Sequence, residues 1–272
     1  MPSYNSISAD KLARLIGTPN CPVLVDVCTD EDFAADPRLI PGAVRRSHRD
    51  VSSWAPGFAD KSVIAICQTG QKLSEGVAAW LRQAGASAES LDGGALGWAQ
   101  AGLPMVPAAK IPPRDAQGRT IWVTRSRPKI DRIACPWLIR RFVDPSAVFL
   151  FVAPSEVAGV ADPFDATPFD VENVFWSHRG ELCTFDVMVG EWGLASEPLK
   201  RLATIVRGAD NDRLDLAPQA AGLLAASLGL SRMHAGDLEQ LDAGMGLYDA
   251  FYRWCRDATA EAHNWPSKRT GA

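Results

Sequence analysis

Residues 62–91 read SVIAICQTGQKLSEGVAAWLRQAGASAESL and predict a strand, a helix and a second strand. Ser62 to Cys67 is a short apolar run, which is typical of a buried parallel strand. Glu75 to Ala84 has apolar residues at helical spacing, and Gly85 ends this helix. Ala88 to Leu91 can form the next strand. This order is a βαβ unit, so we expect a parallel sheet with helices on its faces.

The residues on both sides of this unit suggest two domains. Upstream, Ser8 can cap a helix over Ala9 to Ile16, and Val23 to Val27 is another buried strand. Downstream, residues 104–118 read PMVPAAKIPPRDAQG, with four prolines and no apolar period, which is typical of a linker. We therefore expect an α/β domain over residues 1–107, a Pro-rich linker over residues 108–118 and a second domain over residues 119–272.

The second half has a different pattern and predicts an α+β domain that ends in a helical bundle. From Glu197 onward the apolar residues recur at helical spacing. The earlier elements are expected to be a strand at Thr120–Thr124, a helix at Asp131–Val143, a strand at Val148–Val152 and a hairpin that pairs Val174–Ser177 with Cys183–Val189.

Composition indicates a globular protein of the reducing cytoplasm. The chain has 272 residues, of which 47% are hydrophobic and 22% charged, and its net charge of −4 argues against a general polyanion binder. No apolar run is long enough for a membrane span, and the first residues lack a secretory signal. Six scattered cysteines without a Cys-x-x-Cys pair favour reduced thiols. We therefore expect a cytoplasmic protein with no membrane partner.

The loop after Cys67 is the sharpest candidate site. Cys67 ends a buried strand, and a helix begins at about Ser74, so the backbone N–H groups between them can point inward and form an anion cradle around the sulfur. Such a cradle makes a thiol nucleophilic at neutral pH. The alternative is an ordinary buried cysteine beside a βα loop. The residues that would form the cradle are Gln68, Thr69, Gly70, which permits a tight curl, Gln71 and the cationic Lys72.

Residues 5–107 resemble the rhodanese family of sulfurtransferases. The motifs that carry the resemblance are Leu24-Val25-Asp26-Val27, Glu31-Asp32-Phe33, Ile40-Pro41-Gly42-Ala43, the Cys67–Ser74 loop, and Leu91-Asp92-Gly93-Gly94 followed by Trp98, Ala101, Gly102 and Pro104. The resemblance implies a Cys67 persulfide, a small sulfur donor such as thiosulfate or a persulfide, a thiol acceptor and no cofactor for sulfur transfer.

The details of the loop sharpen this resemblance. Sulfur-handling members of the superfamily use six residues from the cysteine onward, whereas phosphatase and arsenate-reductase relatives use a longer loop that ends in Arg. Here the sixth residue is Lys72 and no Arg follows, which favours a persulfide. Two residues depart from the family pattern: Cys28 replaces a usual Arg, and Leu39 replaces a frequent His. Cys28 is either a second redox thiol or a partly buried cysteine. Asp26 is interpreted as structural.

A basic segment opens the second half. Residues 119–141 carry seven basic residues and one acidic residue, Asp131. The rest of the chain therefore has a net charge of −10. Arg125, Lys129 and Arg132 lie where a strand leads into a helix and could bind an oxyanion together with the helix N-terminus. The alternative is a solvated basic face in which Asp131 caps the helix.

A candidate metal site lies further along, in His178-Arg-Gly-Glu-Leu-Cys183-Thr-Phe-Asp186. If residues 179–182 form a hairpin tip, His178 and Cys183 face each other, which suits zinc or another soft divalent ion. Two ligands are too few, so Asp131 or Asp186 would have to join them. The alternative is a hydrogen-bonded histidine beside a packed cysteine.

Residues 120–266 resemble the C-terminal domain of the chromate-resistance (ChrB-type) family. The segments that carry the resemblance are residues 122–145, 178–186, 205–232 and 248–258. The resemblance implies chromate or a sulfate-like oxyanion as a partner. Some members regulate a chromate transporter, but a rhodanese-like domain stands here in place of their N-terminal domain, which argues against a DNA-binding role.

The expected function is therefore a thiosulfate or persulfide sulfurtransferase linked to an oxyanion- or metal-binding domain in chromate or sulfur stress. The first alternative is a redox or chromate sensor that acts by binding a partner or DNA, through the basic segment, although no recognition helix is apparent. The second is direct reduction of chromate. Because no flavin or dinucleotide motif is present, the electrons would then have to come from thiols.

Overall fold

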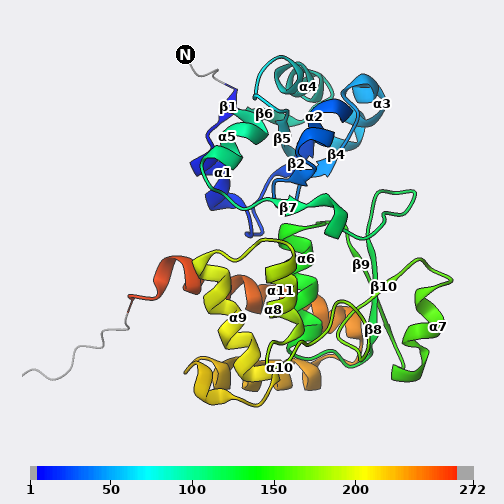
Figure 1. Ribbon diagram of the computed structural model, residues 1–272, viewed down its shortest axis with the longest axis vertical. Coiled ribbons are helices and arrows are strands. Elements are labelled where there is room, and N and C mark those ends of the chain that lie inside the picture. Colours follow the sequence, from blue (N-terminus) through cyan, green and yellow to red (C-terminus); the bar gives the residue numbers. More distant parts are fainter. Residues whose placement is uncertain (1–4, 262–272) are drawn as a thin grey trace, which may run out of the picture.

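The first half is built on a parallel sheet. The computed structural model describes residues 5–261 (Figure 1). Its five-stranded sheet has the order β1-β6-β5-β2-β4, and every pairing is parallel, which confirms the predicted α/β class. The strands are β1 (Ser6–Ile7), β2 (Val23–Asp26), β4 (Val44–Arg45), β5 (Ser62–Ile66) and β6 (Ser87–Leu91).

Helices cover both faces of this sheet because its strands are apolar on both sides. Along β5, Ile64 belongs to the same buried cluster as Leu12 of helix α1, whereas Val63 and Ala65 belong to another with Leu81 of helix α4. The alternation follows the two-residue period of a strand. The helices are α1 (Ala9–Leu15), α2 (Asp30–Ala35), α3 (Val51–Trp54), α4 (Lys72–Gln83) and α5 (Gly94–Gln100), with 3-10 turns at His48–Asp50 and Ala55–Phe58.

The segment between the halves lies against both of them. Strand β3 (Arg38–Leu39) pairs antiparallel with β7 (Val106–Pro107), and a 3-10 turn at Ala108–Lys110 follows. The Lys110 Nζ is 2.7 Å from Glu191 Oε2 in the second half. Residues 108–118, expected to form a linker, are thus attached by side-chain contacts, and the exact domain limits stay a prediction.

The second half begins with a smaller sheet of order β10-β8-β9, which is also parallel. Its strands are β8 (Ile121–Arg125), β9 (Val148–Val152) and β10 (Thr167–Pro168), and helix α6 (Asp131–Phe142) connects β8 to β9. The predicted strand, helix and strand at the start of this half are therefore confirmed to within two residues.

The rest of the second half is mainly helical, as predicted. In Figure 1, α6, α8, α9 and α11 lie together beside the small sheet. Among the described residues, no helix is both long and apolar enough to span a bilayer. The elements are α7 (Val157–Ala161), α8 (Thr184–Glu191), α9 (Glu197–Asp210), α10 (Ala220–Met233), α11 (Asp237–Arg253), a π-helical turn at Trp254–Ala258, and 3-10 turns at Pro154–Glu156 and Leu214–Leu216.

The predicted hairpin around residues 179–182 is wrong. Its tip forms, as an isolated antiparallel bridge between Arg179 and Leu182, but Trp176 of the predicted first strand bridges Phe169 instead. The segment predicted as the second strand starts helix α8. Cys183 caps this helix, with its backbone N–H and side chain both directed to Asp186. Nearly every residue in the first two turns of α8 is buried, so the helix has no polar face, and its apolar run looks like a strand.

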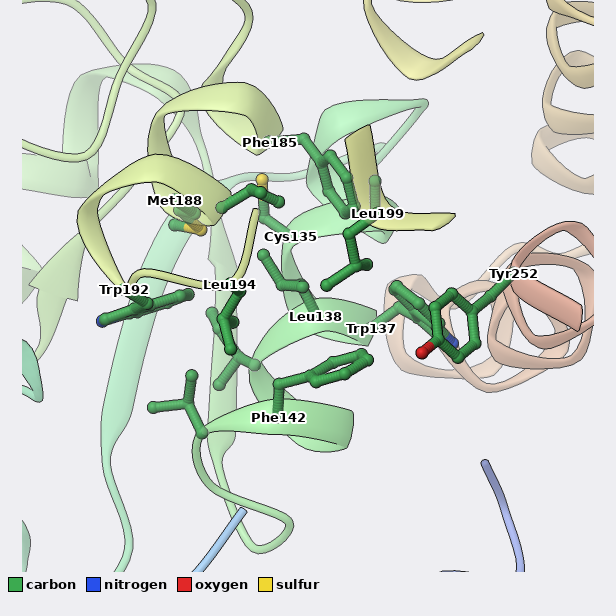
Figure 2. Close-up of a cluster of buried hydrophobic side chains, with 14 of the residues drawn as sticks. Cys135, Trp137, Leu138, Phe142, Phe185, Met188, Trp192, Leu194, Leu199 and Tyr252 are labelled. Atoms are coloured by element: carbon green, nitrogen blue, oxygen red, sulfur yellow. The ribbon is translucent and has the colours of Figure 1, made fainter. Parts of the chain in front are cut away.

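Helix α6 forms the centre of the core in the second half (Figure 2). The Trp137 side chain is fully buried, and its ring centroid lies 5.5 Å from that of Tyr252 and 5.7 Å from that of Phe142. The Trp137 Nε1 donates a hydrogen bond to Asp249 Oδ1 at 2.8 Å. The first residue of α6, Asp131, is also fully buried, so core packing fixes the position of a carboxylate.

Candidate functional site

Cys67 lies at the carboxyl end of β5, where the loop to α4 begins. Its side chain is only 4% exposed, and its Sγ donates to the Gln71 carbonyl oxygen at 3.3 Å and lies 3.1 Å from Ser74 Oγ. The N–H groups of residues 68–71 donate no hydrogen bond within the described part of the chain. These unused donors belong to the loop that joins the thiol to the N-terminus of a helix, where an anion is stabilised.

Two glycines allow the loop to curl this tightly. Gly70 and Gly94 both have positive φ, of 73° and 57°. A Cβ on Gly70 would lie 2.3 Å from the Leu91 carbonyl oxygen, and one on Gly94 would lie 2.2 Å from the Cys67 carbonyl oxygen. The Ala95 N–H also donates to the Cys67 carbonyl at 3.0 Å. The Asp92-Gly93-Gly94 turn is therefore the support of the Cys67 loop.

The five residues predicted to form the cradle follow Cys67 directly. Gln68 and Gly70 are half-buried, whereas Thr69, Gln71 and Lys72 are exposed. Lys72 is the first residue of α4, which begins three residues earlier than predicted. Their roles in binding sulfur stay a prediction.

Cys28 is a buried thiol beside the Cys67 loop. Its Sγ donates to Asp26 Oδ2 at 3.5 Å, and its N–H donates to Asp26 Oδ1 at 3.1 Å. Burial, followed by the charge of Asp26, raises the pKa of Cys28 far above its usual value, and Cys67 adds to this shift. Cys28 is therefore a neutral thiol at neutral pH. Arg45 also contacts Asp26, at 3.3 Å, so Asp26 holds this part of the sheet together.

A cavity of mixed charge beside Cys28 was not predicted. It measures about 710 Å³, and its lining includes Cys28, the basic residues Arg45, Arg46, His48 and Arg49, and the acidic residues Asp30, Glu31 and Asp50. A smaller cavity of about 190 Å³ is lined by both Cys28 and the loop residue Gln68. The basic run 45–49 was a visible signal in the sequence, but only the fold places it near the Cys67 loop.

A second cluster lies where α6, α9 and the β10–α8 connection meet. The His178 Nε2 lies 3.6 Å from Asp131 Oδ2, 3.4 Å from Asp170 Oδ1 and 3.2 Å from Asp210 Oδ2. Asp131 begins α6 and Asp210 ends α9. The structure thus brings together the predicted Asp131 and His178, and it adds Asp170 and Asp210. Asp170 lies in none of the segments that carry a family resemblance, and Asp210 lies in segment 205–232 but was not singled out there. Only the tertiary structure brings them to His178.

Cys183 does not join this cluster as predicted. Among the described residues, the ligand atoms of Asp131, Asp170 and His178 lie within 4.8 Å of one another, and Cys183 is not part of this group. Its Sγ donates to Asp186 Oδ2 at 3.3 Å. Cys183 thus caps α8 beside the cluster. Burial raises the pKa of Asp131, and a hydrogen bond from the Cys183 thiol lowers this pKa by less.

The predicted oxyanion residues separate into two groups. Arg125 and Arg132 each lie 3.3 Å from Asp170 Oδ2, so a carboxylate already compensates their charge. Lys129 is exposed and makes no ion pair with the described residues. The three cations therefore do not converge on one empty pocket, although two of them meet at Asp170.

The carboxylates control the protonation of His178. Hydrogen bonds to Asp170 and then to Asp210 raise the pKa of His178 from 6.5 to about 10. Burial, then the charges of Asp210 and Asp170, raise the pKa of Asp131 well above its usual value. Without a bound ion, His178 is therefore a cation that bridges three acidic residues.

We predict that His178 in chelator-treated protein stays protonated from about pH 6 to pH 8, because its pKa is raised. Its contribution to the free energy of unfolding is full below about pH 6.5 and is lost as the pH rises toward 10. NMR of the ring protons measures this titration, and the spectrum of His178→Gln identifies the signal. A His178 signal that titrates near pH 6.5 would contradict the prediction.

Comparison with known proteins assigns both halves. Residues 8–101 match the family described as the rhodanese-like domain, and residues 122–255 match the family described as ChrB, C-terminal domain. The chain is also similar to protein ChrB of Cupriavidus metallidurans, with 34% identity over 155 residues, which is 56% of this chain and 46% of that protein. It therefore spans less than half the length of this relative.

Two solved structures are similar to part of the chain. A rhodanese-like domain protein from Staphylococcus aureus is 28% identical over 35% of this chain and 90% of that chain, with a TM-score of 0.31. A rhodanese-related protein from Thermoplasma volcanium is 24% identical over 38% of this chain and 98% of that chain, with a TM-score of 0.33.

Proposed function

Because the chain carries a rhodanese-like domain at residues 8–101 and a ChrB-type domain at residues 122–255, we propose that it is a sulfurtransferase that acts in resistance to chromate or sulfur stress. The sulfur carrier is Cys67, and the donor is thiosulfate or a small persulfide. The observation that carries the proposal is the position of Cys67 at the start of a loop whose backbone N–H groups, at residues 68–71, donate no hydrogen bond within the described chain.

In the first step the Cys67 thiolate attacks the outer sulfur of thiosulfate. A sulfur–sulfur bond forms at Cys67 Sγ, the sulfur–sulfur bond of thiosulfate breaks, and its electron pair leaves with sulfite. The product is a Cys67 persulfide. The loop amides stabilise its terminal negative charge by charge-assisted hydrogen bonds, and the N-terminus of α4 adds its dipole.

In the second step an acceptor takes the outer sulfur. A thiolate attacks the terminal sulfur of the persulfide, and the Cys67 thiolate leaves with the electron pair of the broken bond. Cyanide can act as the acceptor in an assay and is converted to thiocyanate. Sulfur transfer in this scheme requires no cofactor, because every bond that forms is balanced by a sulfur–sulfur bond that breaks.

The second half of the chain supports an oxyanion context for this activity. The proposed role in chromate or sulfur stress depends on the match of residues 122–255 to the ChrB C-terminal domain. It also depends on the 34% identity of the chain to a ChrB protein over 155 residues. Chromate resembles sulfate in charge and shape, so the two contexts share their oxyanion chemistry.

The direct test is thiocyanate formation from thiosulfate and cyanide, together with the mass of the protein after incubation with thiosulfate alone. We expect turnover and the addition of one sulfur atom. If the purified chain neither forms thiocyanate nor gains a sulfur from thiosulfate or a small persulfide, the proposal is wrong.

Replacing Lys72 with Met should slow sulfur transfer without abolishing it. The cradle would lose a cation at the start of α4 but keep its backbone amides, which costs about 1–2 kcal/mol for one exposed charge-assisted contact. This corresponds to roughly a 5- to 30-fold lower rate of thiocyanate formation. Lys61→Met, a second exposed lysine outside the loop, is the matched control. Equal rates in both variants would mean that the amides suffice.

A further inference from the structure

We propose that Asp131, Asp170 and His178 form a binding site for a divalent transition-metal ion in the ChrB-type half, with Asp210 beside it. The separations between His178 Nε2 and the three carboxylate oxygens are 3.2, 3.4 and 3.6 Å. Ligands held about 2.0–2.2 Å from one ion lie about 3–3.6 Å from each other. The ligand atoms of Asp131, Asp170 and His178 also lie within 4.8 Å of one another, whereas Asp210 is not part of this group. These three side chains thus already have the spacing of one coordination shell.

An independent observation is an unsatisfied oxygen on the most deeply buried ligand. Asp131 is 0% exposed, and its Oδ1 has no hydrogen-bond partner within the described residues. Its other oxygen, Oδ2, accepts hydrogen bonds from the Thr184 and Phe185 N–H groups, at 2.6 and 3.3 Å, and faces His178. A buried carboxylate oxygen without a donor is costly, and a cation would satisfy it.

The surroundings position the other ligands as an outer shell does in metal proteins. The two oxygens of Asp170 have separate partners: Oδ2 faces Arg125 and Arg132, whereas Oδ1 accepts from Thr184 Oγ1 at 2.9 Å and faces His178. The arginines therefore hold one side of this carboxylate and leave the other directed toward the centre.

The donor set indicates the class of ion. Carboxylate oxygens with one imidazole suit Mn²⁺, Fe²⁺ or Zn²⁺, whereas the missing thiolate disfavours softer ions. Cys183, five residues after His178, donates to Asp186. The His178 side chain is 39% exposed, so an ion can enter from solvent and keep an open position. Binding requires neutral imidazole, so uptake of the ion releases the His178 proton to solvent.

This proposal is independent of sulfur transfer at Cys67, and its test uses binding to the full chain. After treatment with a chelator, the protein is titrated with Mn²⁺, and the loss of the free-ion electron paramagnetic resonance signal is measured. Mn²⁺ is the first probe because thiolates bind it weakly. We expect one Mn²⁺ per chain, and an affinity at least about tenfold lower in Asp131→Asn and in His178→Gln.

Three controls make the result decisive. His234→Gln replaces a histidine outside the cluster and should bind like the unchanged protein. Circular dichroism checks the fold, and His178→Gln, which replaces a partly exposed side chain, serves if Asp131→Asn fails to fold. Zn²⁺ is titrated in parallel, and Zn²⁺ binding that persists in His178→Gln belongs to thiols elsewhere. If neither ion binds the unchanged protein more tightly than His178→Gln, the cluster is an ion-pair network and the proposal is overturned.

Discussion

Replacing Cys67 with Ser is expected to abolish thiosulfate sulfurtransferase activity, whereas Cys21→Ser should leave it nearly unchanged. A serine hydroxyl stays protonated at neutral pH and cannot form a persulfide, so both half-reactions are lost. Burial raises the pKa of Cys21 to about 11, with Arg141 opposing the shift, and Cys21 is therefore a poor nucleophile. Thiocyanate formation measures turnover, and protein mass after thiosulfate treatment measures the added sulfur.

A further variant separates the two interpretations of Cys28. If Cys28 is a packed thiol, Cys28→Ser should keep both turnover and the added sulfur, because the hydroxyl can replace the thiol as a donor to Asp26. A second redox thiol would instead be needed for turnover. Full activity in Cys67→Ser would contradict the assignment of Cys67 as the sulfur carrier, regardless of the result for Cys28→Ser.

The second large effect is expected on stability. Trp137→Ala should lower the free energy of unfolding by about 3–5 kcal/mol, because a fully buried indole is lost from a core that cannot close around the cavity. The hydrogen bond from Trp137 Nε1 to Asp249 Oδ1 is lost as well. Denaturation by urea, followed by tryptophan fluorescence and circular dichroism, measures the change.

Trp80 provides the matched control, because it is the same residue type on the outer side of α4 and is 52% exposed. Trp80→Ala should change the free energy of unfolding by no more than about 0.5 kcal/mol. A loss below about 1 kcal/mol in Trp137→Ala would contradict the central place of α6 in the core. Such a result would also weaken the argument that packing fixes Asp131.

Residues close together in the chain were predicted well. Strands β5 and β9 and helix α6 match their predicted bounds to within one residue, because a short apolar run or a helical period is a property of consecutive residues. The Cys67 loop was likewise readable, since its strand, its glycine and its helix follow one another. The predicted start of α4 was three residues late because the polar residues before Glu75 show no helical period.

Other features depended on packing between distant segments. Helix α8 was mistaken for a strand because it is buried almost all round, and Cys183 was consequently expected beside His178. The meeting of Asp131, Asp170 and Asp210 at His178 could not be predicted, because about forty residues separate each successive pair of these acids.

The sequence by itself determined the two kinds of domain, the position of the Cys67 loop and the helical character of the C-terminal part. Neighbouring residues were enough to predict these features, because the hydrogen bonding of a helix and the two faces of a strand repeat over a few residues. Only the tertiary structure decided which carboxylates surround His178 and which cations compensate them. That choice depends on how α6, α8 and α9 pack, since burial of their apolar faces brings together polar residues that share no pattern in the chain.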